Sequence, residues 1–279
     1  MCMLRVAHIS DLHFFSYPNS LKGYLGKNGL GVLNHLFFRK KIFHSRVFKN
    51  LLTEILEQNI QELWISGDIS VSGTLEEFLC AKEELAPFIH SSLKIRMVPG
   101  NHDIRSNLQH SLAQLFLNKE RFSPVETISI HPDVDLITLD LSHNNKKRDS
   151  GLFCSALEKT FEAHLLASQK PQIAILCHYP PPVAEGKNNR LVGGSDLQKI
   201  LQAHPKIVLF AHGHTHQQSL HHLQNTLVAN PGVSRGSFGR YNFYEIGSKS
   251  MKFELRRVEK KNSDEVWKND QVYLKEIHT

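Results

Sequence analysis

Five short apolar runs along the chain each end in a cluster of polar residues. The runs span residues 4–10, 62–66, 94–99, 172–177 and 206–211, and their length and composition predict buried β-strands. The clusters that follow them are, in order, Asp11-Leu12-His13, Gly67-Asp68, Gly100-Asn101-His102-Asp103, His178 and Gly213-His214-Thr215-His216. Because ligands and chemistry gather at strand ends in α/β sheets, we expect these clusters to form one site.

Helical patterns separate the strands. Residues 44–59 carry apolar side chains at helical spacing, which predicts a helix packed on a sheet: Val47, Phe48, Leu51, Leu52, Ile55 and Leu56. Three places have N-cap chemistry, and a helix is expected to begin near each: Thr74 with Glu77, Ser155 with Glu158, and Ser195. Residues 135–141 alternate and predict a further strand.

The residue types in the five clusters suit divalent metal ions. Imidazole, carboxylate and amide oxygen are ligands for manganese, iron or zinc, and the absence of cysteine among them argues against a structural zinc site. Two carboxylates beside two divalent cations leave a surplus of about two positive charges, for which an anionic phosphoryl group is the natural guest. Two ions roughly 3.5–4 Å apart can clamp such a group and activate a water molecule for in-line attack.

In this order the clusters resemble the five motif blocks of the calcineurin-like metallophosphoesterase family, over residues 4–232. The resemblance implies an α/β fold, a two-sheet β-sandwich flanked by helices in four layers. It also implies two divalent metal ions, with manganese expected first and iron or zinc as alternatives. One ion would be bound by Asp11, His13, Asp68 and His216, and the second by Asp68, Asn101, His178 and His214. Asp68 would bridge the ions.

The same resemblance assigns His102 as the catalytic histidine that binds no metal, with Asp103 orienting it. A single histidine is more often structural, and the chain has 18 of them, so only the joint spacing of the motif histidines singles them out. His212 is expected either to orient a ligand or to have a structural role at a strand end. A protonated His102 would stabilise developing charge or donate a proton to the departing oxygen.

Composition predicts one domain over residues 1–279. The chain is 41% hydrophobic, enough to bury one large core, and no linker rich in Pro, Gly or Ser divides it. Its four cysteines lack paired spacing, which indicates a reducing compartment: Cys2, Cys80, Cys154 and Cys177. The first predicted strand leaves no room for a signal peptide, and no apolar run reaches the roughly 18 residues of a membrane span. We therefore expect a cytoplasmic protein.

A basic, aromatic stretch follows the first cluster. Residues 12–53 contain no Asp or Glu, and basic residues alternate there with aromatic ones, so much of the net charge of +6 is local. We predict that residues 14–44 form an inserted cap beside the site, which would favour an anionic membrane surface. The alternative is that its apolar residues close the core and its basic residues form a solvated face. The segment from residue 256 is expected to be a covering strand, a surface helix or a membrane contact.

The predicted cap over residues 14–44 favours one substrate within the family. Within the family, the chain is similar to hydrolases that cleave UDP-2,3-diacylglucosamine to lipid X and UMP, at the inner membrane surface, in lipid A biosynthesis. It departs from the better-known lineage, which has Arg where His102 stands. The alternatives are a soluble cyclic-nucleotide or other small phosphodiesterase, a metal-dependent nuclease, and a non-catalytic scaffold. Nucleic acid is disfavoured as a partner because the charge is confined to one aromatic segment, and a serine/threonine phosphatase is disfavoured because Asp103 stands where that branch has Glu.

Overall fold

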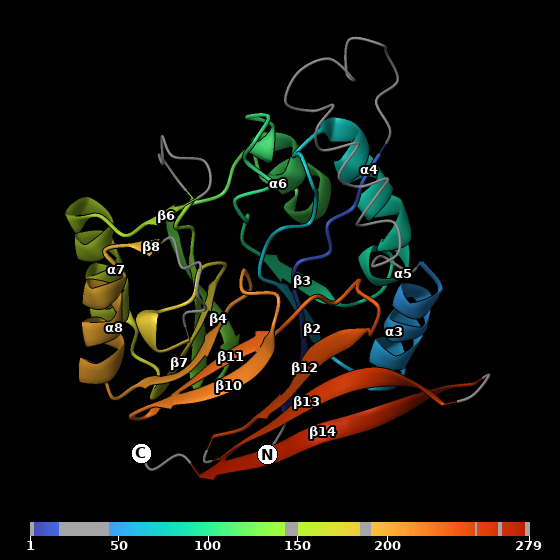
Figure 1. Ribbon diagram of the computed structural model, residues 1–279. Coiled ribbons are helices and arrows are strands. Elements are labelled where there is room, and N and C mark those ends of the chain that lie inside the picture. Colours follow the sequence, from blue (N-terminus) through green and yellow to red (C-terminus); the bar gives the residue numbers. More distant parts are fainter. Residues whose placement is uncertain are drawn as a thin grey trace.

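Two six-stranded sheets stack face to face, with helices on both outer sides (Figure 1). The computed structural model describes residues 3–16, 45–142, 150–184, 191–248, 250–261 and 264–276. The architecture is the four-layer α/β sandwich expected from the sequence.

The first sheet has the strand order β14-β13-β12-β1-β2-β3. Its parallel part consists of β1 (Leu4–Ile9), β2 (Glu62–Ile65) and β3 (Lys94–Met97). Antiparallel strands extend it: β12 (Arg240–Ile246), β13 (Ser250–Lys261) and β14 (Asp264–Glu276). Helices α3 (Ser45–Glu57), α4 (Leu75–Glu84), α5 (Ala86–Ile89) and α6 (Gln109–Leu117) lie on the outer side of this sheet (Figure 1).

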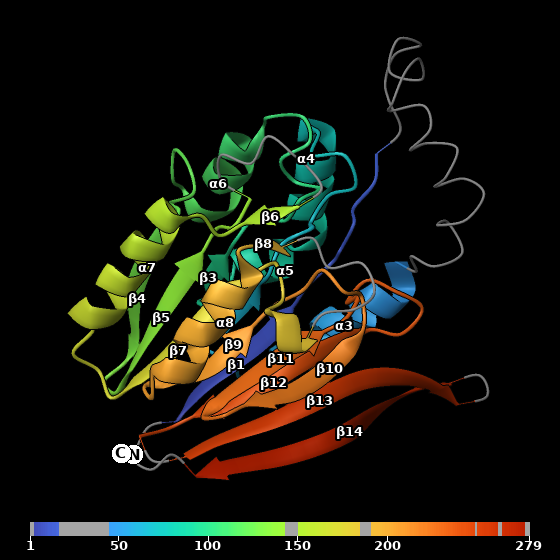
Figure 2. The same cartoon turned by 60° about the vertical axis from the view of Figure 1, so that its left-hand side comes forward.

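The second sheet has the order β10-β11-β9-β7-β5-β4. Its inner strands are parallel: β5 (Val134–Leu139), β7 (Gln172–Cys177), β9 (Ile207–Ala211) and β11 (Thr226–Pro231). Antiparallel strands close both edges: β4 (Val125–His131) and β10 (Gln218–Leu223). Its outer face is covered by α7 (Ser155–Ala167) and α8 (Gly194–Ala203), which stand side by side in Figures 1 and 2. The smaller elements are β6 (Gly151–Leu152), β8 (Leu191–Val192) and the 3-10 turn η2 (Pro182–Ala184).

The strands β1, β2, β7 and β9 consist mainly of apolar residues because both of their faces are buried, whereas the edge strand β3 is partly exposed. In β1, Val6 points into the core between the sheets, whereas Ala7 and Ile9 point into the core beneath α3 and α4. Successive side chains of a strand face opposite ways, so a strand between two apolar layers needs apolar residues at nearly every position. The apolar stripe predicted over residues 44–59 is the buried side of α3, through Phe48, Leu51, Leu52 and Ile55.

A helix begins near each of the three predicted places, but only one of the three predicted capping residues is confirmed. Thr74 closes a capping box at the start of α4, in which it accepts from the Glu77 backbone N–H. The predictions for Ser155 and Ser195 as capping residues are wrong, because each already lies inside its helix. The N-cap of α7 is Cys154, with no side-chain hydrogen bond. The N-cap of α8 is Gly193, whose φ of 78° is a left-handed conformation that suits glycine.

The C-terminal segment from residue 256 forms strands rather than a helix. It continues β13 and turns back as β14, which is the antiparallel edge strand of the first sheet. Of the predicted cap over residues 14–44, positions 17–44 lie outside the described residues. Phe14 is buried against Phe48 of α3. Within the described ranges, the helices are too short or too polar to cross a membrane.

Candidate metal centre

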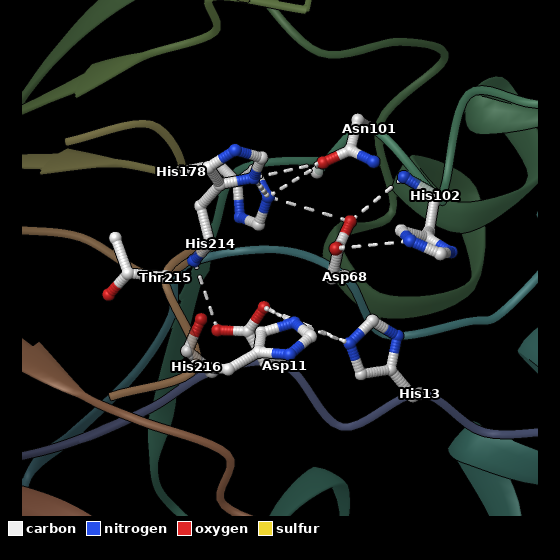
Figure 3. Close-up of polar contacts among 12 residues, drawn as sticks. Asp11, His13, Asp68, Asn101, His102, His178, His214, Thr215 and His216 are labelled. Atoms are coloured by element: carbon white, nitrogen blue, oxygen red, sulfur yellow. Dashed lines mark hydrogen bonds and ion pairs between the residues drawn. The ribbon is translucent and has the colours of Figure 1, made fainter. Parts of the chain in front are cut away.

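The carboxyl ends of five parallel strands bring the predicted site residues together. β1 leads to Asp11 and His13, and β2 leads to Asp68. The block after β3, the residue after β7 and the loop after β9 supply the remaining members: Asn101, His102, His178, His214 and His216. Figure 3 shows all of these side chains turned toward a common centre. The two sheets therefore contribute to the site jointly.

The first group of donors consists of Asp11, His13, Asp68 and His216. One donor atom from each lies within 4.8 Å of all the others. His216 Nε2 is 3.2 Å from Asp11 Oδ1 and 3.0 Å from His13 Nε2. The set corresponds to the first of the two predicted ligand groups.

The second group consists of Asn101, His178 and His214. Asn101 Oδ1 lies 3.2 Å from His178 Nε2 and 3.1 Å from His214 Nδ1, and these two nitrogens are 3.3 Å apart. Asp68 Oδ1 is 3.6 Å from His178 Nε2. Asp68 therefore stands between the groups, the position that a bridging carboxylate needs (Figure 3).

The donor chemistry of both groups fits cations. His178 Nδ1 donates to the Ser66 carbonyl 2.7 Å away, so in the neutral imidazole its Nε2 presents a lone pair toward Asn101 Oδ1, another acceptor. Asp11 Oδ1 is buried and accepts no hydrogen bond. Acceptors crowded in this way repel one another unless positive charge lies between them. Divalent ions bound by nitrogen and oxygen ligands would satisfy all of these atoms at once.

The backbone is strained at most of these positions. Asp11, His13, Asp68, His214 and His216 have φ values of 54°, 46°, 52°, 72° and 60°, in the left-handed region that residues other than glycine seldom occupy. Such strain persists only where the surrounding structure imposes it, and it concentrates at functional sites. Here it turns each side chain sharply back from the end of its strand toward the centre.

Two glycines allow the segments to approach so closely. A Cβ atom on Gly100 would collide with the Asp68 carboxylate, and one on Gly213 would collide with the hydroxyl of Ser10 and approach Asp11. The glycines in the third and fifth motifs thus have a steric role, because the metal-facing carboxylates pack directly against their backbone.

The electrostatics favour the ionised form of Asp11 and Asp68 and the neutral form of His13 and His214. Burial alone would raise the pKa of Asp11, but the neighbouring His216 imidazole holds that pKa well below its usual range. Burial would also raise the pKa of Asp68. The surrounding histidines lower this pKa instead, and His178 has the largest effect among them. Burial lowers the pKa of His13 to about 3 and that of His214 to about 4. These are the protonation states in which both residue types bind metal.

His102 lies beside both groups, but its neighbours differ from the prediction. Its Nδ1 is 2.6 Å from the Val71 carbonyl, its Nε2 is 3.2 Å from Arg105 Nη2, and its Nε2 is 3.9 Å from Asp68 Oδ2. The prediction that Asp103 orients the His102 ring is wrong. Asp103 is buried on the other side of its loop, where the carboxylate accepts hydrogen bonds from Ile69 N, Ser70 N, Ser70 Oγ and Gly100 N. Asp103 therefore joins the second motif to the third. Its carboxylate supplies the acceptor that these buried backbone N–H groups need.

Sequence reasoning missed Asn230, at the end of β11. Its amide Nδ2 donates to the Gly213 carbonyl and to Thr215 Oγ1, both at 2.8 Å, and its Oδ1 accepts from Gly232 N at 2.7 Å. The buried side chain therefore holds the loop that carries His214 and His216. The signal available in the sequence was an Asn at the end of an apolar run, followed by Pro-Gly. His212 is buried beside this loop, with Nδ1 2.9 Å from the Gly213 carbonyl, so it supports the backbone and contacts no predicted ligand side chain.

The family model described as calcineurin-like phosphoesterase matches residues 4–218, which include every predicted ligand. The chain belongs to this family. It is therefore a phosphoric ester hydrolase by family, and the buried Asp and His residues indicate a dinuclear site for divalent metal ions.

Relatives and solved structures extend the comparison. A probable cyclic nucleotide phosphodiesterase from Ruthia magnifica subsp. Calyptogena magnifica is 23% identical over 210 residues, covering 71% of this chain and 84% of the relative. A dimetal phosphatase from Danio rerio superposes with a TM-score of 0.65 at 12% identity, covering 95% of this chain and 98% of that one. GAP50, the anchor in the inner membrane complex of Plasmodium, superposes with a TM-score of 0.62 at 12% identity, covering 100% and 90%. At such identities the structural matches show the fold alone.

Proposed function

We propose that this protein is a metal-dependent phosphodiesterase that hydrolyses a small phosphodiester, with a cyclic nucleotide as the first candidate and manganese as the first candidate metal. The observation that carries the proposal is the complete set of seven donors in two adjoining groups that share Asp68. A scaffold with the same fold has no need to retain these donors. The relative named as a probable cyclic nucleotide phosphodiesterase supports the choice of substrate.

The protein's own residues account for the positioning that such a reaction needs. The bond from His178 Nδ1 to the Ser66 carbonyl sets the ring so that Nε2 faces the centre. Asp11 Oδ2 accepts from the His214 backbone N–H at 3.1 Å, which joins the first strand end to the last. Ions held there would polarise the phosphoryl group and supply an activated water molecule. A diester would lie over Asp68, with His102 on one side of it.

The comparisons support a small phosphodiester better than UDP-2,3-diacylglucosamine, which was the first choice from sequence. That preference depended on the basic, aromatic segment over residues 14–44, most of which lies outside the described residues. No relative reported above is named for a lipid substrate. Binding of that segment to an anionic membrane surface stays a prediction from the sequence.

A substrate panel tests the proposal. Protein stripped with chelator and reloaded with manganese, iron or zinc is given cyclic AMP, bis-p-nitrophenyl phosphate, UDP-2,3-diacylglucosamine and single-stranded DNA. We expect cyclic AMP and the nitrophenyl diester to be hydrolysed, with manganese giving the highest rate, and the exposed-residue variant His110→Ala to match the unaltered protein. Preferential hydrolysis of the lipid nucleotide or of DNA would overturn the choice of substrate. Absence of hydrolysis with every metal would overturn the enzymatic proposal itself.

A further inference from the structure

Arg105 stands beside His102 at the edge of the metal centre. Its Nη2 is 3.2 Å from His102 Nε2, and its Nη1 is 3.2 Å from the Val71 carbonyl. The same carbonyl is 2.6 Å from His102 Nδ1. The guanidinium, the imidazole and one backbone carbonyl therefore form a closed triangle of contacts.

The chemistry of this triangle fixes the direction of each hydrogen bond. A carbonyl oxygen only accepts, so His102 Nδ1 must carry the proton that it shares with Val71. A guanidinium only donates, so His102 Nε2 must be the acceptor from Arg105. In this arrangement the permanently charged group is Arg105, and His102 is its neutral acceptor. The sequence predicted that a protonated His102 would stabilise developing charge. In this arrangement the positive charge beside the site belongs to Arg105 instead.

The position of the guanidinium suits a phosphoryl oxygen. His102 Nε2 is 3.9 Å from Asp68 Oδ2, and Arg105 Nη2 approaches the same nitrogen, so one imidazole edge separates the guanidinium from the carboxylate shared by both donor groups. A charged phosphoryl oxygen accepts a stronger hydrogen bond from a guanidinium than a neutral imidazole nitrogen does. An anionic substrate over Asp68 would therefore draw Nη2 away from His102 and onto itself.

We propose that Arg105 is a catalytic residue that contacts a phosphoryl oxygen of the bound phosphodiester, and that His102 and the Val71 carbonyl hold its guanidinium in place beforehand. The inference rests on the proposed phosphodiesterase function and adds a substrate contact to it. Once Nη2 has moved onto the bound substrate, the permanent charge of Arg105 stabilises charge on the phosphoryl group without any proton transfer to or from the guanidinium.

The test uses the metal-loaded full-length protein, with Arg105→Gln and Arg105→Lys as variants and the exposed Arg121→Gln as the matched control. Turnover of bis-p-nitrophenyl phosphate and calorimetric binding of inorganic phosphate are measured, together with metal content. We expect Arg105→Gln to lose roughly 10²-fold in kcat/KM and about tenfold or more in phosphate affinity, at unchanged metal content. Arg105→Lys should recover part of the phosphate affinity, because it restores the charge without the planar fork.

A chemical-rescue experiment tests whether Arg105 contacts the phosphoryl oxygen directly or only stabilises the structure of the metal centre. Arg105→Ala should regain phosphate binding and turnover when guanidinium is added at a concentration too low to unfold the protein. Unchanged phosphate affinity and kcat/KM in Arg105→Gln would overturn the proposal, and so would a parallel loss of metal, which would make Arg105 a support of the centre. If the unaltered protein turns over no diester, the proposed function fails, yet phosphate affinity still decides whether Arg105 contacts the anion.

Discussion

Asp68 is the residue on which both donor groups depend. Its Oδ1 accepts from the His102 backbone N–H at 2.8 Å and lies 3.6 Å from His178 Nε2, while one of its oxygens also belongs to the group with Asp11 and His13. A single carboxylate thus joins the loops after β2 and β3 to a histidine from the other sheet. No other described residue belongs to both groups.

Replacing Asp68 by Asn tests this position directly. The amide is nearly the same size but lacks the charge that offsets two adjacent cations, so metal content should fall from about two ions per chain to about one or none, and turnover should be abolished. Elemental analysis and a diesterase assay measure the two effects. Asp196→Asn on α8, an exposed carboxylate, is the matched control. Two retained ions with normal turnover would contradict the bridging assignment.

At the scale of elements, the ends of β9 and β11 act as one unit through Asn230. The loop that carries His214 and His216 leaves β9, and the neighbouring parallel strand β11 supplies the side chain that binds its backbone. The loop residues are strained, so they need an external restraint to keep their conformation.

The isosteric change Asn230→Asp should loosen this loop. It removes the donor to the Gly213 carbonyl and buries an acceptor beside it, which should cost roughly 1–3 kcal/mol in unfolding free energy and lower metal affinity by about 10–100-fold. Metal titration and urea unfolding measure the two effects. Asn225→Asp, in the exposed turn between β10 and β11, should change neither. Metal affinity equal to that of the unaltered protein would show that the loop holds its shape without Asn230.

At the scale of the whole molecule, the core between the sheets contains a buried polar chain behind the metal centre. His8 Nε2 lies 2.8 Å from Ser66 Oγ and its Nδ1 lies 3.0 Å from the Tyr244 hydroxyl, which also accepts from Asn242 Nδ2. Ser66 supplies the carbonyl that orients His178. The chain therefore links the interior of the sandwich to the site, and it is enclosed only because the two sheets pack together.

Burial of His8 predicts a pH-dependent stability. Burial lowers its pKa from 6.5 to about 3, so between these values the unfolded chain binds a proton that the folded protein does not. His8 thus contributes stability above pH 6.5 that is lost as the pH falls, by about 1.4 kcal/mol per pH unit. Asp103 and Glu77 oppose this trend, because burial raises their pKa values to about 6 and about 7.

Comparing variants isolates the contribution of His8 from these opposing groups. In metal-free protein, His8→Gln should reduce the slope of unfolding free energy against pH by about 1.4 kcal/mol per unit between pH 5 and 6. Urea unfolding at several pH values gives the slope, and the exposed His110→Gln serves as control. An unchanged slope in His8→Gln would show that the folded protein binds this proton after all.

The sequence by itself determined the strands that lead into the site and nearly all of the residues gathered there. Their signals are local: an apolar run of strand length, then a short polar motif at its carboxyl end, as in Asp11 after β1 and His178 after β7. The capping residues were less predictable. The first residue of α7 depends on backbone conformation, and the N-cap is Cys154 rather than the adjacent Ser155.

Only the tertiary structure decided which partner each polar group takes. Asp103 faces the backbone of the second motif, Arg105 faces His102, and Asn230 holds the Gly213 loop. Most of these contacts join segments far apart in the chain, and all of them depend on where a turn directs a side chain after the sheets have packed. The composition and the spacing of residues do not indicate the direction in which a turn points a side chain. The physical reason is that a hydrogen bond is set by geometry over about 3 Å, whereas a sequence motif specifies only the chemistry available to make it.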